Sequence, residues 1–224
     1  MSVAPAVSAS HRTAVLLINL GTPAAPETGA VRRYLAQFLS DARVIDYPRW
    51  LWLPILHAAI LRVRPRVSAR AYAKIWTPQG SPLLVHSQAL AAKLAQTGLR
   101  VELAMRYGEP TIDAEIERLN AEGVEQVLLL PLYPQYSATS TASAFDGVFA
   151  ALRRRRRLPE LRSINDYHAA PEYIAALAES VERYWLTHGR GERSARTWHG
   201  SGERSDNGGD LSRKFLFHGE HRHL

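Results

Sequence analysis

The sequence predicts an α/β fold built on a doubly wound parallel sheet. The apolar run Ala14–Leu20 (AVLLINL) ends in Gly21, a pattern typical of a strand buried on both faces. Further strand patterns alternate with amphipathic helix patterns, which implies parallel strands joined by right-handed crossovers. Ligands of such sheets bind beyond the carboxyl ends of the strands. We therefore expect the functional site in the loops after Leu20, Met105 and Leu130.

The other elements follow in chain order. A helix is predicted from Pro26 and Glu27 to Leu39, because apolar side chains recur there at helical spacing. Glycines end two later helices, at Gly98 and Gly123. The patterns predict helices over residues 83–96, 111–122, 143–153 and 171–187, and strands over residues 100–107, 124–132 and 161–166.

The segment Trp50–Ile60 (WLWLPILHAAI) has two interpretations. It is too short to span a bilayer, which takes about 20 apolar residues. It is either a core helix or an exposed apolar lip that contacts a flat apolar ligand or a membrane surface. Trp50 and Trp52 suit an interface, because an indole joins an apolar body to a polar N–H. The flanking arginines, which would meet anionic groups, are Arg43, Arg49, Arg62, Arg64 and Arg66.

Composition narrows the classes of function. A chain of 224 residues that is 46% hydrophobic can bury a core and form one α/β domain, with at most a partial second one. The absence of cysteine excludes disulfides, thiolate-bound zinc, a cysteine nucleophile and Cys-ligated iron–sulfur clusters. The net charge of +7 favours an anionic partner, yet no nucleic-acid-binding pattern is present. The first residues lack a basic leader followed by an apolar stretch, so we expect a cytoplasmic protein.

The composition of the sequence changes at Gly191, after which Gly, Ser, Arg, His, Asp and Asn dominate and no helical or strand periodicity remains. We expect a disordered N-terminus over residues 1–12, a folded lobe over 13–190 and an atypical, disordered tail over 191–224. The tail contains the histidine-rich text HGEHRH, but without a scaffold its spacing is weak support for a metal site. The run Arg153–Arg157 is interpreted as a solvated helix end. The turn Asn19–Pro23 matches no phosphate-binding motif, and Pro23 lacks a backbone N–H.

Four motifs resemble those of ferrochelatases and occur in the same order as in that family. The resemblance covers residues 14 to about 188. The motifs are LLINLGTP (Leu16–Pro23), YAKIWTPQGSPLLVHS (Tyr72–Ser87), AMRYGEP (Ala104–Pro110) and LLPLYPQYSATSTAS (Leu129–Ser143). The segment Pro48–Arg66 is similar to the pocket lip of bacterial members. The resemblance implies a Rossmann-like chelatase lobe with the second lobe incomplete or missing. It also implies insertion of ferrous iron into protoporphyrin IX to form protohaem, with iron as substrate and no permanently bound cofactor.

A porphyrin is a large apolar disc with two carboxylates at one edge. Its pocket needs aromatic and aliphatic walls and a few cationic or hydroxyl groups at the rim. Each candidate has a plain alternative, since tyrosines can cap the sheet and hydroxyls can cap helices. The residues that we expect to bind porphyrin are Leu20, Ser81, Arg106, Tyr107, Tyr133, Tyr136 and Ser137.

Metal insertion also requires a base for the pyrrole protons and a ligand for iron, and histidine suits both roles. In the resembled family this histidine lies in a strand reading roughly FSFHG, soon after the helix that ends here near His188. The segment Lys214–Glu220 (KFLFHGE) makes His218 the candidate catalytic and metal-binding residue. His218 stands about twenty residues late, so a true counterpart and a chance match both remain open. His168 is interpreted as structural.

Three functional hypotheses remain at this stage. The first is a ferrochelatase whose tail reflects a frame error, a truncation or a damaged gene. The second is a half-protein that holds porphyrin without metallating it, and the third is a chelatase for another tetrapyrrole. No counterpart of the carboxylate that faces the histidine is found, so we expect the chain as written to be weakly stable and a poor or inactive chelatase.

Overall fold

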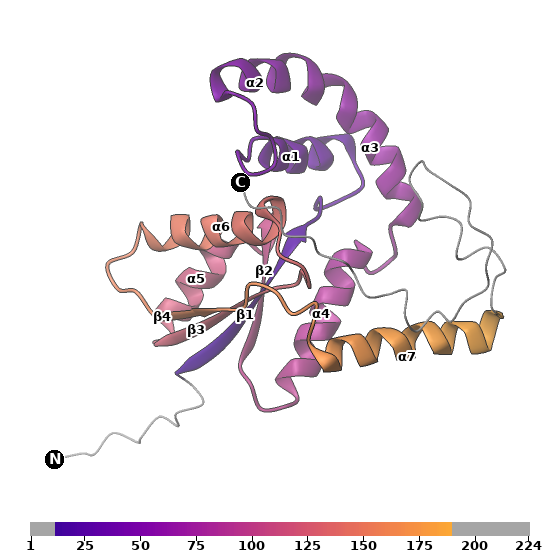
Figure 1. The fold of residues 1–224 in the computed structure, drawn as a ribbon. Helices are drawn as coiled ribbons and strands as arrows, with labels where there is room; N and C mark the ends of the chain where they lie inside the picture. The colour runs from indigo at the N-terminus through magenta and orange to yellow at the C-terminus, as the bar shows by residue number, and fades with distance from the viewer. Residues whose placement is uncertain (1–11, 190–224) are drawn as a thin grey trace, which may run out of the picture. The chain divides into compact units, whose positions relative to one another are not determined.

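The computed structural model describes residues 12–189. Its centre is a parallel sheet with the strand order β2-β1-β3-β4 and helices on both faces (Figure 1). The strands are β1 (Thr13–Gly21), β2 (Val101–Tyr107), β3 (Gln126–Pro131) and β4 (Glu160–Ser163). Because β2 and β3 lie on opposite sides of β1, the winding reverses there, and ligands of such sheets bind beyond the carboxyl ends of the strands at this point. The doubly wound α/β prediction is confirmed.

The helices lie close to their predicted bounds, except around the lip. The helices are α1 (Thr28–Leu39), α2 (Arg49–Ile55), the π-helical turn η2 (Leu56–Ile60), α3 (Leu61–Ile75), α4 (Pro82–Ala95), α5 (Ile112–Ala121), the π-helical turn η3 (Ala138–Ala142), α6 (Ser143–Leu152) and α7 (Pro171–His188). The chain divides into two compact units after Tyr173, so most of α7 belongs to the second unit.

Strand β1 is buried on both faces, as its apolar run predicts. Leu16 and Ile18 pack with side chains of α5 and α6 on one face of the sheet. Val15 and Leu17 pack on the other face, against Leu84 and other side chains of α4. The central strand therefore joins two cores and fixes the position of its carboxyl end.

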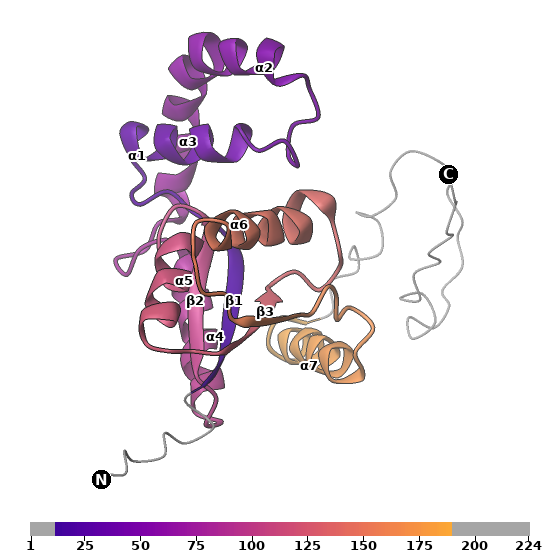
Figure 2. The ribbon, with the colours of Figure 1, turned by 90° about the vertical axis from the view of Figure 1, so that its left-hand side faces the viewer.

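Helices α1 and α3 and the segments between them form a layer beyond the carboxyl ends of β1 and β2, which we call the helical layer (Figure 2). Its core includes Val31, Leu56 and Leu61, together with Tyr107 from the end of β2. Helix α2 contains Pro54 and buries no residue, and the π-helical turn follows this proline. Trp50 is 79% exposed, so α2 fits the lip interpretation better than the core interpretation.

The arginine run Arg153–Arg157 corrects one expectation. Four of its side chains are exposed, but that of Arg155 is only 8% exposed. Its Nη1 donates to Asp113 Oδ1 at 2.9 Å, and its Nη2 lies 2.8 Å from Glu117 Oε2. Arg155 therefore fixes the end of α6 to the first turn of α5, and the prediction of a fully solvated run was wrong for this residue.

Helix α7 shows a row of exposed apolar side chains over its length, namely Ile174, Leu177, Val181 and Tyr184. None of the helices within residues 12–189 is both long and apolar enough to cross a membrane. The predictions for residues 1–11 and for the tail from residue 190 on, including His218, lie outside the described residues.

Candidate functional site

Two glycines bring the loops after β1 and β2 into close contact. Gly21 has φ +102°, and a Cβ there would lie 1.7 Å from the carbonyl oxygen of Tyr107. Gly108 has φ +85°, and its Cβ would lie 2.6 Å from the carbonyl oxygen of Thr22. Only glycine tolerates both the left-handed conformation and the close approach. Leu20 and Thr22 are therefore held beside the end of β2.

Aromatic rings from α1, α3 and β2 line the base of the helical layer. Tyr34 packs edge-on against Tyr72 at 6.3 Å and against Tyr107 at 6.4 Å between ring centroids. Phe38 meets Tyr107 edge-on at 5.3 Å. Burial raises the pKa of Tyr34, and proximity to Tyr72 adds to the rise. These phenols stay neutral at ordinary pH, so this wall is aromatic and uncharged.

Tyr133 follows β3 and adds a further ring to this region. Burial raises the pKa of its phenol, with a smaller contribution from Tyr107. Its buried hydroxyl has no hydrogen-bond partner among the described residues. The backbone N–H of Leu132 donates to the carbonyl of Ile18 at 2.8 Å, so the loop that holds Tyr133 starts beside the end of β1.

A buried carboxylate, Asp41, accepts hydrogen bonds from three separate segments of the chain. Its Oδ2 accepts from Arg106 Nη2 at 2.6 Å, from the Tyr107 hydroxyl at 2.7 Å and from Ser143 Oγ at 2.6 Å. Its Oδ1 accepts from the backbone N–H of Arg43 at 2.7 Å, and its side chain is 6% exposed. We call Asp41, Arg106, Tyr107 and Ser143 the Asp41 cluster.

The ionisation of Asp41 follows from these contacts. Burial alone would raise the pKa of this carboxyl group. The hydrogen bonds from Ser143, Tyr107 and the backbone of Arg43, together with the charge of Arg106, outweigh burial and hold the pKa below its ordinary value. Asp41 is therefore charged at neutral pH and pairs with the charge of Arg106.

A second ion pair joins the α1–α2 loop to α6. Here the loop supplies the cation, Arg43, and α6 supplies the carboxylate, Asp146. Arg43 Nε donates to Asp146 Oδ2 at 2.7 Å, and Arg43 Nη2 donates to Asp146 Oδ1 at 3.2 Å. Both side chains are 44% exposed. The indole N–H of Trp52 also donates to the carbonyl oxygen of Leu39 at 2.6 Å, which fixes α2 to the end of α1.

The hydroxyls of Ser81 and Ser87, both in the motif Tyr72–Ser87, lie inside the protein. Thr22 Oγ1 donates to Ser81 Oγ at 2.8 Å, and both residues are buried. Asn19 Nδ2 donates to Ser87 Oγ at 3.0 Å, and Ser87 Oγ donates to the carbonyl oxygen of Leu83. These contacts hold the first turns of α4 against the end of β1.

The structure thus separates the expected porphyrin-binding residues into two sets. Leu20, Tyr133 and Ser137 are partly exposed and Tyr136 is 55% exposed, so these side chains remain accessible near the ends of β1 and β3. Ser137 Oγ and Thr139 Oγ1 lie 2.9 Å apart. The second set consists of Ser81, Arg106 and Tyr107, whose polar atoms bond to protein groups, as described above.

Sequence reasoning missed Asp41 as a candidate, and it treated Tyr34 only as part of the apolar side of a helix. Asp41 is a single acid in a loop, 65 residues from Arg106 in sequence, and no local pattern marks such a pair. The expected role of Arg106 at the substrate rim therefore overlooked its internal partner.

Metal ligands do not gather in the described part of the chain, since residues 12–189 contain no group of three or more His, Asp or Glu side chains suited to a metal. His57 of η2, His86 of α4 and His168 of the segment before α7 are exposed and lie in different parts of the chain. The candidate His218 lies outside the described residues.

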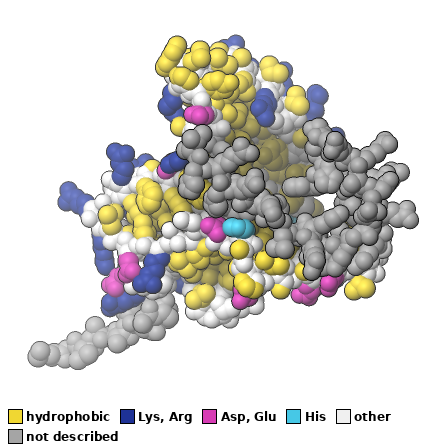
Figure 3. All heavy atoms as spheres, in the orientation of Figure 1, with side chains coloured by type: hydrophobic (Ala, Val, Ile, Leu, Met, Phe, Trp, Pro, Cys, Tyr) yellow, Lys and Arg dark blue, Asp and Glu magenta, His cyan; other side chains and the backbone are white. Residues whose placement is uncertain are grey.

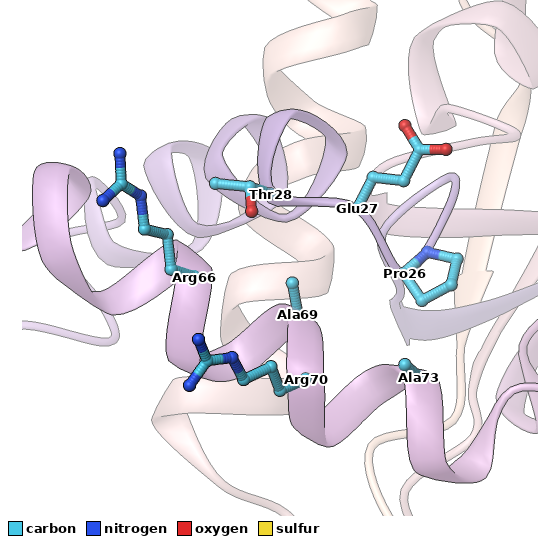
Figure 4. Close-up of a pocket in the computed structure, with 7 residues that line it drawn as sticks. All are labelled: Pro26, Glu27, Thr28, Arg66, Ala69, Arg70 and Ala73. Carbon is cyan, nitrogen blue, oxygen red and sulfur yellow. The ribbon is translucent and has the colours of Figure 1, made fainter.

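A cavity of about 490 Å³ lies between the start of α1 and α3 (Figure 4), and no residue of the Asp41 cluster lines it. Arg66 and Arg70 project from α3 and have no ion pair within residues 12–189, while Glu27 comes from the segment before α1. The residues that line the cavity are Pro26, Glu27, Thr28, Arg66, Ala69, Arg70 and Ala73.

Comparisons with known proteins agree with the motifs. The family model described as Ferrochelatase matches residues 12–221. The chain is 52% identical over 205 residues to a ferrochelatase of Aeromonas hydrophila subsp. hydrophila, covering 89% of the chain and 63% of that relative. It is 50% identical over 207 residues to one of Methylibium petroleiphilum (90% and 57% covered) and 49% over 224 residues to one of a Polaromonas species (94% and 61%). It therefore spans about three-fifths of the length of these curated relatives.

Proposed function

The chain belongs to the ferrochelatase family, and from that premise we propose that its protein inserts ferrous iron into protoporphyrin IX to form protohaem. The reaction would be the terminal step of haem biosynthesis, with iron and porphyrin as substrates and no permanently bound cofactor. The observation that supports this best is the set of accessible side chains at the ends of β1 and β3, namely Leu20, Tyr133, Tyr136 and Ser137, within a chain that matches the family from residue 12 to 221.

The accessible set suits a flat apolar disc. Leu20, Tyr133 and Tyr136 would contact the macrocycle, and the Ser137 hydroxyl would reach its polar edge. The phenol of Tyr133 is neutral because burial raises its pKa, so no charge would lie against the ring. Ser81, Arg106 and Tyr107 would support this surface from beneath, because their polar atoms already bond within the protein.

We assign the chemical role to His218. Insertion releases two pyrrole protons, and a histidine with a pKa near neutrality can accept protons and can bind a divalent metal while neutral. The family match extends to residue 221 and so includes the segment FLFHG, which supports His218 as the counterpart of the family histidine.

The test combines porphyrin binding with metal insertion. Protoporphyrin IX would be titrated by fluorescence into the chain and into Tyr133→Ala and Leu20→Ala, with Leu158→Ala as a remote, exposed control. We expect the two site variants to bind about tenfold more weakly, since each removes apolar contact area, and the control to bind normally. Equal binding by all variants would contradict the assigned wall.

Zinc insertion followed by absorbance then tests the chemistry. Turnover that is lost in His218→Ala, with porphyrin binding retained, would support the proposed role of this histidine. Tight porphyrin binding by the chain with no insertion at all would favour the second hypothesis, a porphyrin-holding protein. Near-normal turnover would contradict our expectation that the chain as written is a poor chelatase.

We also propose a cytoplasmic protein that contacts the membrane surface through Trp50–Ile60. Apolar side chains gather over α2, with arginines beside them (Figure 3). Leu51 and Ile55 are exposed in addition to Trp50, and Arg62 and Arg64 are exposed without an ion pair in the described structure. Such a surface binds anionic headgroups and the acyl boundary together.

Cosedimentation of the protein with vesicles that contain phosphatidylserine tests this contact. The bound fraction should fall in Trp50→Ala and on added salt. Equal binding to neutral vesicles would contradict the role of the arginines.

A further inference from the structure

Three segments that are distant in sequence meet at one oxygen atom. Asp41 lies in the loop between α1 and α2, Arg106 and Tyr107 end β2, and Ser143 begins α6. Their three donors lie within 2.7 Å of Asp41 Oδ2. One carboxylate oxygen of the α1–α2 loop thus accepts hydrogen bonds from the end of β2 and from the start of α6.

The contacts continue from this oxygen toward the proposed binding surface, because Leu20 packs against the core that contains Tyr107. Tyr107 packs edge-on against Tyr34 and Phe38 of α1, so its orientation affects the aromatic wall. The Arg106 guanidinium lies 4.8 Å from the centre of the Tyr107 ring. Gly147 leaves room for this side chain, since a Cβ there would lie 3.2 Å from Arg106 Cδ.

We propose that Asp41 is a positioning residue for porphyrin binding, an inference that rests on the proposed function. Its carboxylate holds the Tyr107 hydroxyl and the α1–α2 loop together and thereby sets the distance between the lip and the tyrosine wall. The charge of Arg106 is neutralised by Asp41, so Arg106 acts on the porphyrin through this cluster and not through the propionates.

Two porphyrins distinguish positioning from direct contact. Protoporphyrin IX has two carboxylates, and its dimethyl ester has the same ring without charge. Asp41→Asn and Arg106→Gln should each weaken binding of both porphyrins by about tenfold, because each leaves a buried polar partner unpaired. The double variant should bind no more weakly than either single variant, since both act on one cluster.

Asp146→Asn is the matched control. It removes one carboxylate from the exposed pair with Arg43 in the same loop, and binding should stay within about twofold of the wild type. Weaker binding of only the free acid by Arg106→Gln would show that Arg106 contacts a propionate, and it would overturn the proposal. An equal loss in Asp146→Asn would overturn it as well.

Hydrogen exchange without porphyrin separates this inference from the proposed function. In Asp41→Asn, amides of residues 39–52 should exchange faster, while those of β1 and β3 keep their protection. Unchanged exchange at residues 39–52 would overturn positioning, and so would equal acceleration in β1, which indicates general destabilisation. If the wild-type chain binds neither porphyrin, the proposed function fails for this chain, whereas local acceleration in the variant still supports the role of Asp41 in positioning the loop.

Discussion

The sheet and the helical layer differ in how far their apolar side chains are exposed to solvent. Leu16, Leu17 and Ile18 of β1 are fully buried, whereas Trp50 of α2 is 79% exposed and Val63 of α3 is 68% exposed. The sheet is packed on both faces, but the helical layer keeps an apolar outer surface. Exposed apolar surface of this kind indicates a binding role. The sheet therefore fixes the geometry and the helical layer presents contact area, with the Asp41 cluster joining the two.

The largest effect should come from the contact between β1 and β2. In Gly21→Ala, the new Cβ would lie 1.7 Å from a backbone oxygen, so we expect a loss of more than about 4 kcal/mol of unfolding free energy or no folded protein. Gly98→Ala is the control, since Gly98 also has positive φ but has open space around it; its loss should be about 1–2 kcal/mol. Urea unfolding followed by circular dichroism measures both, and equal losses would contradict the steric explanation.

The next effect compares a core leucine with a lip leucine. Leu16→Ala should lower the free energy of unfolding by roughly 3 kcal/mol, because it leaves a cavity in a packed core. Leu51→Ala, at an exposed position of α2, should change it by less than about 0.5 kcal/mol. Similar losses in the two variants would mean that the lip is part of the folded core, and the comparison between the two regions would fail.

A smaller, pH-dependent change in the free energy of unfolding is expected at the Asp41 cluster, which joins the sheet to the helical layer. Asp41→Asn should lower the free energy of unfolding by about 2 kcal/mol at pH 7, because a buried charged hydrogen-bond acceptor is lost. The folded pKa of Asp41 lies below its unfolded value of about 3.9, so its stabilisation is complete above about pH 5 and is lost as the pH falls through the folded pKa. The difference between wild type and variant in urea unfolding should therefore shrink at acid pH, and a difference that grows there would contradict the charge assignment.

The parallel sheet was predictable because β1 and β3 are short apolar runs and the strands alternate with helices of clear period. The strand predicted over residues 161–166 is shorter in the structure because β4 is an edge strand whose ladder with β3 ends at Ser163. For the lip the sequence offers a helix only as one interpretation of Trp50–Ile60, and it does not predict α3, since Pro54 and Pro65 interrupt the pattern that normally indicates a helix.

The candidate site was predictable only where local sequence determines it. The motifs place Leu20 and Tyr133 at strand ends, and the parallel register brings these ends together. The pairing of Arg106 with Asp41 depends on how the α1–α2 loop returns to the sheet, and that path is set by tertiary packing. Local sequence thus indicates which side chains reach the edge of the sheet, but not which of them remain free to bind a ligand.

The position of β1 in the middle of the sheet has a consequence for synthesis of the protein. Thr13 of β1 pairs with Gln126 of β3, 113 residues later in the chain. At about 5–20 residues per second, β1 leaves the ribosome on the order of ten seconds before this neighbour has been made. During that interval the edge of β1 that pairs with β3 is open, and the core that Leu16 and Ile18 form with α5 and α6 is incomplete. The most buried strand of the finished protein is therefore the segment with the longest exposure to aggregation in the nascent chain, and the one whose protection by a chaperone matters most.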